Sequence, residues 1–473
     1  MYLTKRLRIY SLSPDKYVVC NALTGEVLLL GRTAYQHLEA LREGRSIECG
    51  PEVLRALEEK RLAFRSVADE DAAFRSLVES SLSEYLTRAR IEYCFVVNTH
   101  CNFNCVYCFE SEAARAALAT LTDDQLDAAF RIVDQAIAAQ PGSPAPEFTL
   151  FGGEPLLLPS KATVRALISR IKSRGYKANV ITNGHMLADF FDVLDVYHES
   201  IEAIQITLDG TEIDHNCRRV LKGGAGTFSK IVANVDAFLT RDYDTRCYIR
   251  TSFDKNNLHG LAALKRFLDD HGWSHHPRVS VFPVTIQDHR PCSSIGGLIG
   301  YHDLLEALLP YSTDFGGGPF DLSTIHVLGH IRNFLAKARK GEQLRFSPRA
   351  TFCGGEALRL FVFHPDGHIY PCYELTGQAH IAIGTYYPEY RMDPSKSEQW
   401  SGARLLRQQE CFDCTISTFC GGGCASGALA KTGKLNAAFC EHAHEVFDRY
   451  FGLIKQLYGR QMDRSRAVAC EIS

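Results

Sequence analysis

Between about residues 90 and 285, short apolar runs alternate with amphipathic segments. Six of these runs are strand candidates, and several are nearly continuously apolar, which is typical of parallel strands buried on both faces. They are CFVVN (94–98), EFTLF (147–151), ANVIT (178–182), AIQITL (203–208), CYIRTSF (247–253) and RVSVFPV (278–284). Because helical patterns lie between them, the alternation predicts an α/β fold, a partial (βα)6 TIM-type barrel over residues 89–290. Ligands of such folds bind at the carboxyl ends of the strands.

Residues 1–88 predict a separate small α+β module. The segment 17–30 predicts a strand, a turn at Thr24-Gly25 and a second strand. An amphipathic helix over 31–44, closed by Gly44, and a further helical piece over 51–62 follow. Beyond the barrel, the chain divides into a helical bridge (291–350), a cysteine-rich domain (351–445) and a closing helix with a tail (446–473).

The charge balance excludes some classes of partner. Lys and Arg number 52 against 55 Asp and Glu, a formal charge of -3 over 473 residues. This balance provides no broad basic surface for nucleic acid or an anionic membrane. No stretch approaches the ~20 apolar residues of a membrane span, and the first residues lack the apolar core of a signal peptide. We expect a cytoplasmic protein.

The 17 cysteines point to metal chemistry. Disulfides are rare in a reducing compartment, so crowded cysteines there indicate metal ligands. Cys101, Cys105 and Cys108 directly follow the first strand of the barrel. Thiolates are the usual ligands of Fe–S clusters, and a cubane held by three of them leaves one iron open for a reaction. A structural zinc site, with His100 as a fourth ligand, is the alternative.

This CxxxCxxC segment, at the end of the first strand of a βα array, resembles the radical S-adenosylmethionine (radical SAM) superfamily. The resemblance implies a 4Fe–4S cluster whose open iron chelates the methionine amine and carboxylate of SAM. Reductive cleavage of SAM then gives a 5′-deoxyadenosyl radical, which abstracts a hydrogen from the substrate. The cofactor carries the hard chemistry, and the protein supplies position and shielding.

Segments at the ends of the next strands resemble the SAM-contacting motifs of the superfamily. Residues 151–155 resemble its GGE segment, residues 182–184 its TNG segment, and residues 206–210 its SLDG segment. Two glycines let a backbone approach a ligand closely, although GGE alone would be an ordinary turn. The resemblance implies cofactor contacts from Gly152, Gly153, Glu154, Thr182, Asn183, Thr207 and Asp209.

Two arginines extend this set. Asp214, His215 and Arg218 resemble an HD-x-x-R stretch with its first two residues swapped. Arg218 could pair with a carboxylate, and a solvated charge at a helix start is the alternative. Arg250, on the fifth predicted strand, is a further candidate for cofactor binding.

Seven cysteines between Cys353 and Cys440, with Gly367 among them, match the spacing of the SPASM domain at every position. The resemblance implies two auxiliary Fe–S clusters. Zinc is the alternative, but seven cysteines do not divide into two sites of four thiolates. By resemblance, an outer cluster takes Cys411, Cys414, Cys420 and Cys440, and an inner one takes Cys353, Cys372 and Cys424. The fourth inner position is an open iron, a non-cysteine ligand or a distant cysteine such as Cys292.

Proteins with both domains mostly modify peptides or proteins. The chain resembles the peptide (RiPP) maturases, which implies a precursor peptide substrate and an oxidative thioether or C–C crosslink. It also implies an electron donor such as flavodoxin or ferredoxin. The module over 1–88 resembles a small domain where a leader peptide adds a strand to a sheet edge. A cap that only packs on the barrel is the alternative.

Two other functions stay open. Anaerobic sulfatase maturases, which make formylglycine, resemble this chain in both cluster domains but place an Asp base just after the second SPASM cysteine. Here Tyr373 and Glu374 follow Cys372, so these two residues are the candidates for a proton or radical role. A protein of another class, a non-catalytic iron–sulfur electron carrier or redox sensor, would keep the clusters without SAM cleavage.

Overall fold

The computed structural model describes residues 1–46, 50–110, 118–287, 296–311, 320–321, 347–401, 404–440, 442–449 and 451–452. Six strands, each parallel to the next, form the predicted partial barrel, which is confirmed. These strands are β6 (Glu92–Asn98), β7 (Glu147–Gly152), β8 (Ala178–Thr182), β9 (Ile201–Thr207), β10 (Arg246–Phe253) and β11 (Val279–Thr285).

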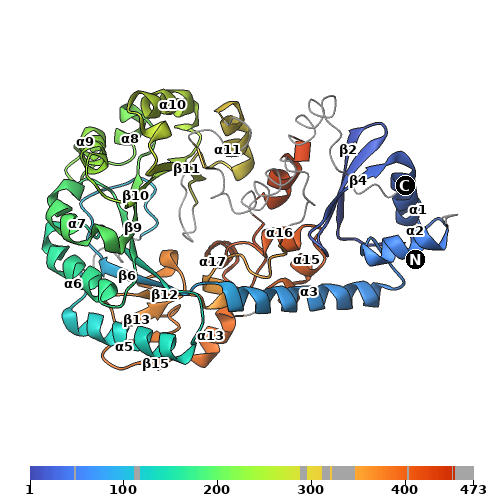
Figure 1. The fold of residues 1–473 in the computed structure, drawn as a ribbon, viewed down its shortest axis with the longest axis horizontal. Coiled ribbons are helices and arrows are strands. Elements are labelled where there is room, and N and C mark those ends of the chain that lie inside the picture. Colours follow the sequence, from blue (N-terminus) through green and yellow to red (C-terminus); the bar gives the residue numbers. More distant parts are fainter. Residues whose placement is uncertain are drawn as a thin grey trace.

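Helices cover the convex face of this curved sheet (Figure 1). They are α5 (Asp123–Ala139), α6 (Lys161–Lys172), α7 (Phe191–Tyr197), α8 (Glu212–Asn216), α9 (Phe228–Leu239) and α10 (Leu261–Asp270). Side chains of β6 are buried on both faces: Phe95 packs with the helices, whereas Cys94 packs with Val362 and Tyr370 on the other face. Burial on both sides explains why the strands read as continuous apolar runs.

The N-terminal module is a three-stranded antiparallel sheet with helices. Its elements are β1 (Tyr2–Leu3), β2 (Leu7–Ser13), β3 (Lys16–Asn21), β4 (Val27–Gly31), α1 (Arg32–Arg42), α2 (Pro51–Glu59) and β5 (Ala63–Phe64). The two strands and two helices expected from the sequence are present, and Gly44 has a positive φ of 70°. The strand β2 and the helix α3 (Val67–Arg88) were not predicted from the sequence. In α3 only Glu70, Phe74 and Val78 are buried, so its apolar stripe is sparse.

The cysteine-rich region extends the barrel sheet. Its first strand, β12 (Leu360–Phe363), pairs parallel with β6, and three antiparallel strands follow. These are β13 (His368–Tyr370), β14 (Gly384–Thr385) and β15 (Arg391–Met392). The helices of the region are α13 (Pro394–Trp400), α14 (Arg404–Arg407), α15 (Gln409–Phe412), α16 (Ser417–Cys420) and α17 (Ala425–Thr432). One ten-stranded sheet therefore links both cysteine-bearing parts of the chain.

Of the predicted helical bridge, the structure describes α11 (Tyr301–Leu308) and a few flanking residues. Cys292 and the tail beyond residue 452 lie outside the described residues. Residues 443–449 are helical, as expected for the closing helix. Within the ranges described, no helix combines the length and apolar character that crossing a bilayer requires.

Candidate active site

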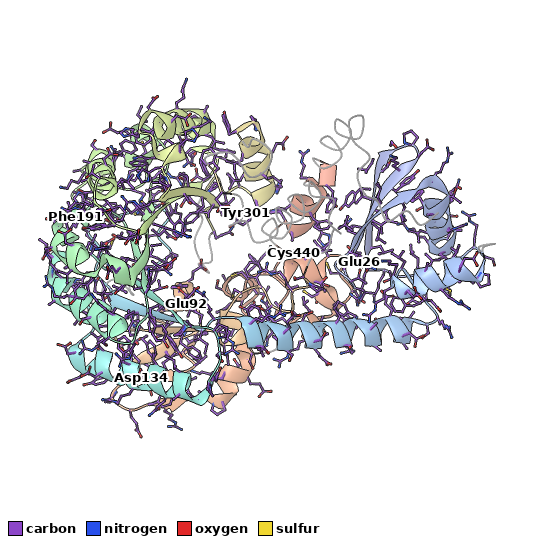
Figure 2. All side chains as sticks on the ribbon, in the orientation of Figure 1. Glu26, Glu92, Asp134, Phe191, Tyr301 and Cys440 are labelled. Atoms are coloured by element: carbon purple, nitrogen blue, oxygen red, sulfur yellow. The ribbon has the colours of Figure 1, made fainter. Side chains whose placement is uncertain are left out.

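A cavity of about 500 Å³ lies at the carboxyl ends of the barrel strands. Its lining includes Phe151, Gln205 and Val284 from three of these strands and Tyr301 from α11. In Figure 2, Tyr301 and Cys440 lie in the middle of the molecule, between the barrel and the N-terminal module. Six cysteines from both groups line this one cavity: Cys101, Cys105, Cys108, Cys420, Cys424 and Cys440.

The loop that carries the first three cysteines is fixed by backbone hydrogen bonds to the segment after β9. The amide of Asn104 donates to the carbonyl of Val220 at 2.8 Å, and that of Val106 donates to the carbonyl of Arg218 at 3.1 Å. Phe103 forms a β-bridge with Leu221. The loop is therefore positioned by the protein chain itself.

The thiols on this loop suit an iron–sulfur cluster. None of the described cysteines forms a disulfide bond. Burial raises the pKa of Cys101 to about 12, and the charge of Glu154 adds to this, so a bound cation is needed to hold Cys101 as a thiolate. In the described part of the chain, no three Cys, His, Asp or Glu side chains converge on a point that would hold a single metal ion. Thiolates on a cluster bind different irons and stand further apart, so three thiols on one loop fit a cluster.

Gly152 and Gly153 line the cavity, but the reason for glycine differs from the expected approach to a ligand. A Cβ at Gly152 would lie 2.3 Å from the carbonyl oxygen of Asn98, and one at Gly153 would lie 2.2 Å from that of His100. The φ of Gly152 is 144°, which also favours glycine. The two glycines let this turn pack against the backbone that leads into the cysteine loop.

Glu154 joins this turn to the end of β8. Its buried carboxylate accepts hydrogen bonds from the Thr182 hydroxyl at 2.5 Å, the Asn183 amide at 2.6 Å and the Leu156 amide at 2.8 Å. Burial raises the pKa of Glu154 despite these bonds. The Asn183 side chain donates to Asn102, in the cysteine loop, at 2.8 Å. Three predicted cofactor contacts, Glu154, Thr182 and Asn183, therefore meet at one cavity wall.

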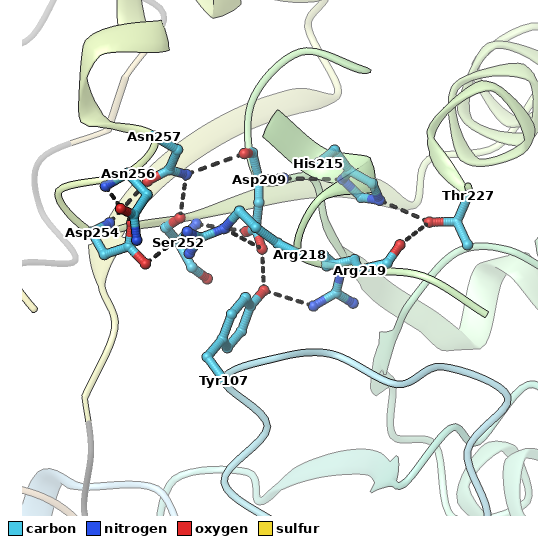
Figure 3. Close-up of polar contacts among 10 residues, drawn as sticks. All are labelled: Tyr107, Asp209, His215, Arg218, Arg219, Thr227, Ser252, Asp254, Asn256 and Asn257. Atoms are coloured by element: carbon cyan, nitrogen blue, oxygen red, sulfur yellow. Dashed lines mark hydrogen bonds and ion pairs between the residues drawn. The ribbon is translucent and has the colours of Figure 1, made fainter. Parts of the chain in front are cut away.

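Asp209 and Arg218 lie behind the cavity wall, in a buried network with Tyr107 (Figure 3). Asp209 accepts from the Tyr107 hydroxyl and, at 2.9 Å, from the Ser252 amide. Arg218 donates to Asp254 at 2.7 Å, and its Nε lies 3.8 Å from Asp209. Arg218 does pair with carboxylates, but they belong to the protein, and neither Asp209 nor Arg218 lines the cavity. Arg218 is 5% exposed, which rules out the solvated alternative.

Arg219 lines the cavity and was missed by the sequence analysis. Its guanidinium donates a hydrogen bond to the Tyr107 hydroxyl at 2.8 Å. The guanidinium carbon also lies over the ring of Phe103, 5.6 Å from the ring centroid. The sequence contains a signal for Arg219. If the HD-x-x-R stretch begins at His215, with Asn216 in the Asp position, its arginine is Arg219. The cavity lining favours this register.

Thr207 and Arg250 are register partners on β9 and β10, and both line the cavity. The Arg250 side chain is exposed to this space. Glu374 also lines it, and its carboxylate accepts from the Ser426 hydroxyl at 2.8 Å. Tyr373 is directed elsewhere, because its hydroxyl donates to Glu92, at the start of β6. Of the two catalytic candidates, the structure brings Glu374 to the cavity.

The thiols of the cysteine-rich region fall into two sets. Burial raises the pKa of Cys411 to about 12, and the neighbouring thiols Cys420, Cys440 and Cys414 raise it further. We call these four cysteines the outer set. Their grouping matches the four ligands that the resemblance assigned to one cluster.

The remaining three cysteines form the inner set. Burial raises the pKa of Cys372 well above its usual value, and Glu374, Cys424 and Cys353 contribute further. Cys424 also exchanges a hydrogen bond with the Ser426 hydroxyl at 3.0 Å. The inner set thus lies next to Glu374 at the cavity.

These observations define a partial (βα)6-barrel protein with a cysteine-lined cavity at the carboxyl ends of its strands. Residues 95–268 match the family model described as the radical SAM superfamily, so this part of the chain is a radical SAM domain. Radical SAM domains bind SAM and a 4Fe–4S cluster. A search among curated proteins gives no match.

Solved structures of anSMEcpe share the fold. The chain superposes on anSMEcpe with bound AdoMet at a TM-score of 0.59 and 16% identity, covering 80% of this chain and 96% of that one. Superposition on native anSMEcpe with bound AdoMet and Kp18Cys peptide gives a TM-score of 0.59 at 17% identity, covering 78% of this chain and 99% of that one. Streptococcus suis SuiB bound to precursor peptide SuiA matches with a TM-score of 0.48 at 14% identity, covering 92% of this chain and 98% of that one.

Proposed function

We propose that this radical SAM enzyme oxidatively modifies a ribosomally made peptide, forming a thioether or C–C crosslink. One observation carries the proposal: the three cysteines of the barrel loop and three of those in the cysteine-rich region line the same cavity. A substrate in this cavity lies between a site for radical generation and a site that can accept an electron.

Cys101, Cys105 and Cys108 would hold the SAM-binding 4Fe–4S cluster. The backbone of Gly152 and Gly153 and the side chains of Thr182, Asn183 and Thr207 line the adjoining wall. Glu154 provides an acceptor for the SAM amine, and Arg219 and Arg250 provide donors for its carboxylate. When bound, SAM and its cluster supply the hydrogen-abstracting radical chemistry of the superfamily. The protein orients the reactants and excludes water from the reacting centre.

The outer and inner sets would hold two auxiliary clusters. A crosslink removes two hydrogens from the peptide: one leaves as an atom, and the other leaves as a proton and an electron. An auxiliary cluster can take up this electron and pass it to a carrier such as flavodoxin or ferredoxin. Glu374 would receive the proton, which is supported by its position in the cavity lining beside the inner set.

A peptide substrate is supported by two features. The anSMEcpe fold is known with a peptide bound, and the present chain has the same fold. The N-terminal sheet has the order β2-β3-β4, so β2 and β4 are its edge strands. An extended leader peptide can add a strand to such an edge.

Formylglycine formation is the second candidate, and Glu374 favours it. That reaction requires a base near the substrate carbon, and Tyr373, which occupies the position after Cys372, is turned toward Glu92. Glu374, one residue later, reaches the cavity instead. Mass spectrometry separates a crosslink from formylglycine made at cysteine, because a crosslink only removes two hydrogens whereas formylglycine formation at cysteine also replaces the sulfur by oxygen. Formylglycine made at serine removes two hydrogens as well and is recognised by its aldehyde.

The first experiment measures SAM cleavage by the anaerobically reconstituted, reduced protein. We expect 5′-deoxyadenosine from the wild type and none from a variant with Cys101, Cys105 and Cys108 changed to Ala. Cys217→Ala, at an exposed cysteine, is the matched control. A loaded wild type that releases no 5′-deoxyadenosine would instead support the electron carrier or redox sensor. The peptide encoded beside the gene, co-expressed with the enzyme, then identifies the product by its mass.

A further inference from the structure

His444 connects the N-terminal module to a cysteine of the outer set. It lies in the helix of residues 443–449, and its Nε2 is 3.4 Å from the sulfur of Cys414. The other ring nitrogen, Nδ1, meets a guanidinium nitrogen of Arg8. Arg8 belongs to β2. One imidazole ring therefore bridges a strand of the N-terminal sheet and a thiol.

The direction of these hydrogen bonds follows from the chemistry of the partners. A guanidinium group has donors only, so Nδ1 of His444 accepts from Arg8. The ring proton of a neutral imidazole then sits on Nε2, which donates to the sulfur of Cys414.

The docking of β2 holds Arg8 in this position. Nη1 of Arg8 lies 3.8 Å from Oδ1 of Asp448, which also accepts a hydrogen bond from the Tyr10 hydroxyl at 2.5 Å. The ring of Tyr10 stacks on Phe451 with centroids 4.8 Å apart. Residues on β2 and on the facing helix thus hold Arg8 beside His444.

We propose that His444 and Arg8 raise the reduction potential of the cluster held by the outer set, so that docking of the N-terminal module controls how readily this cluster accepts an electron. The inference rests on the auxiliary clusters of the proposed function. Hydrogen bonds to cluster sulfurs and nearby charge set the potentials of Fe–S clusters. An N–H donor and a cation beside Cys414 stabilise the more negative, reduced state and thereby favour electron uptake from the substrate.

The test is a redox titration of the full chain, monitored by EPR, in a background with Cys101, Cys105 and Cys108 changed to Ala. Only the auxiliary clusters then contribute to the EPR signal. We expect His444→Leu to move one midpoint potential to more negative values and leave the other in place. The expected size is about a tenfold change in the oxidised-to-reduced ratio at fixed potential, ~59 mV for a one-electron couple.

Two further variants distinguish tuning from loss of packing. His444→Gln keeps a donor for Cys414 and an acceptor for Arg8, so the midpoint potential of the cluster should stay close to that of the protein with His444. Arg8→Gln removes the charge without touching the thiol and should give a smaller shift in the same direction. Arg32→Gln, at a 64% exposed side chain on α1, and His442→Leu, whose ring pairs with Glu445, should leave both potentials unchanged.

Iron and sulfide analysis separates the possible failures. A background protein without auxiliary iron would refute the auxiliary clusters themselves, before any titration. If the clusters are present and neither His444→Leu nor Arg8→Gln shifts a potential, the tuning role is wrong. If His444→Leu loses its cluster, the Arg8→Gln and His444→Gln titrations still decide the question.

Discussion

At the scale of single residues, buried polar groups hold the cavity wall in shape. Glu154 satisfies two backbone amides and one hydroxyl, and His215 performs a similar task behind the wall. Nδ1 of His215 accepts from the Asp209 amide at 3.2 Å, so Nε2 carries the proton and donates to the Thr227 hydroxyl at 3.0 Å. That hydroxyl donates in turn to the carbonyl of Arg219 at 2.6 Å. The backbone of a cavity arginine is thereby positioned by a neutral histidine.

Glu154→Gln should destabilise the protein. The amide group of Gln offers donors where the carboxylate offered acceptors, so either the Asn183 amide or the Thr182 hydroxyl loses its buried partner. The expected cost is about 1–3 kcal/mol in the free energy of unfolding, measured by urea denaturation of the wild type and the variant under the same conditions. Glu147→Gln, at a partly exposed position on the same β7, is the control, and an equal loss in both variants would contradict the role of Glu154.

The stability of the fold should fall with acid because of His215. Burial lowers the pKa of His215 to about 3, whereas an unfolded histidine has a pKa of about 6.5. Between these values the unfolded chain binds a proton that the folded chain does not, so stability decreases as the pH falls from about 6.5 toward 3. This one group contributes at most about 1.4 kcal/mol per pH unit. Denaturation across this range should show a shallower slope for His215→Asn, with exposed His275→Asn as the control for loss of a histidine.

At the scale of secondary structure, the sequence predicts what depends on local pattern and misses what depends on distant partners. The six barrel strands were predictable because apolar runs alternate with helical patterns, and because burial on both faces makes strands such as β6 nearly continuously apolar. The pairing of β12 with β6 was not, since it joins segments more than 250 residues apart in a register of four pairs, Leu360 to Phe363. The site followed the same rule: motifs located Glu154 and the cysteines, whereas the choice between Arg218 and Arg219 required the packing of the loop after β9.

The turn after β7 provides a test at this scale. Gly153→Ala would place a methyl group 2.2 Å from the His100 carbonyl, so the turn and the cysteine loop must separate. We expect a loss of about 1–3 kcal/mol in the free energy of unfolding, as for overpacking, and weaker SAM binding by equilibrium dialysis. Gly223→Ala, where a Cβ meets nothing within 4 Å, should change neither quantity, and similar behaviour of the two variants would refute this account of Gly153.

At the scale of the whole molecule, the outer set lies where three parts of the chain meet. Cys411 packs in one apolar cluster with Leu23 of the N-terminal module and with Phe74 and Val78 of α3. On the other side, Cys420 and Cys440 line the cavity. A cluster at this position would hold together the N-terminal module, the long helix and the wall of the active site, in addition to any role in electron transfer.

Changing Cys411 and Cys414 to Ala should therefore affect more than iron content. Metal binding at such sites is coupled to folding, so we expect fewer irons per chain, lower solubility and faster proteolysis between the N-terminal module and the barrel. The triple Ala variant at Cys101, Cys105 and Cys108 should lose iron without this proteolysis, because backbone hydrogen bonds already fix that loop. Iron analysis with limited trypsin digestion of both variants makes the comparison. If the two variants are cleaved alike, or if loss of Cys411 and Cys414 leaves the N-terminal module protected, the outer set does not join these parts of the molecule.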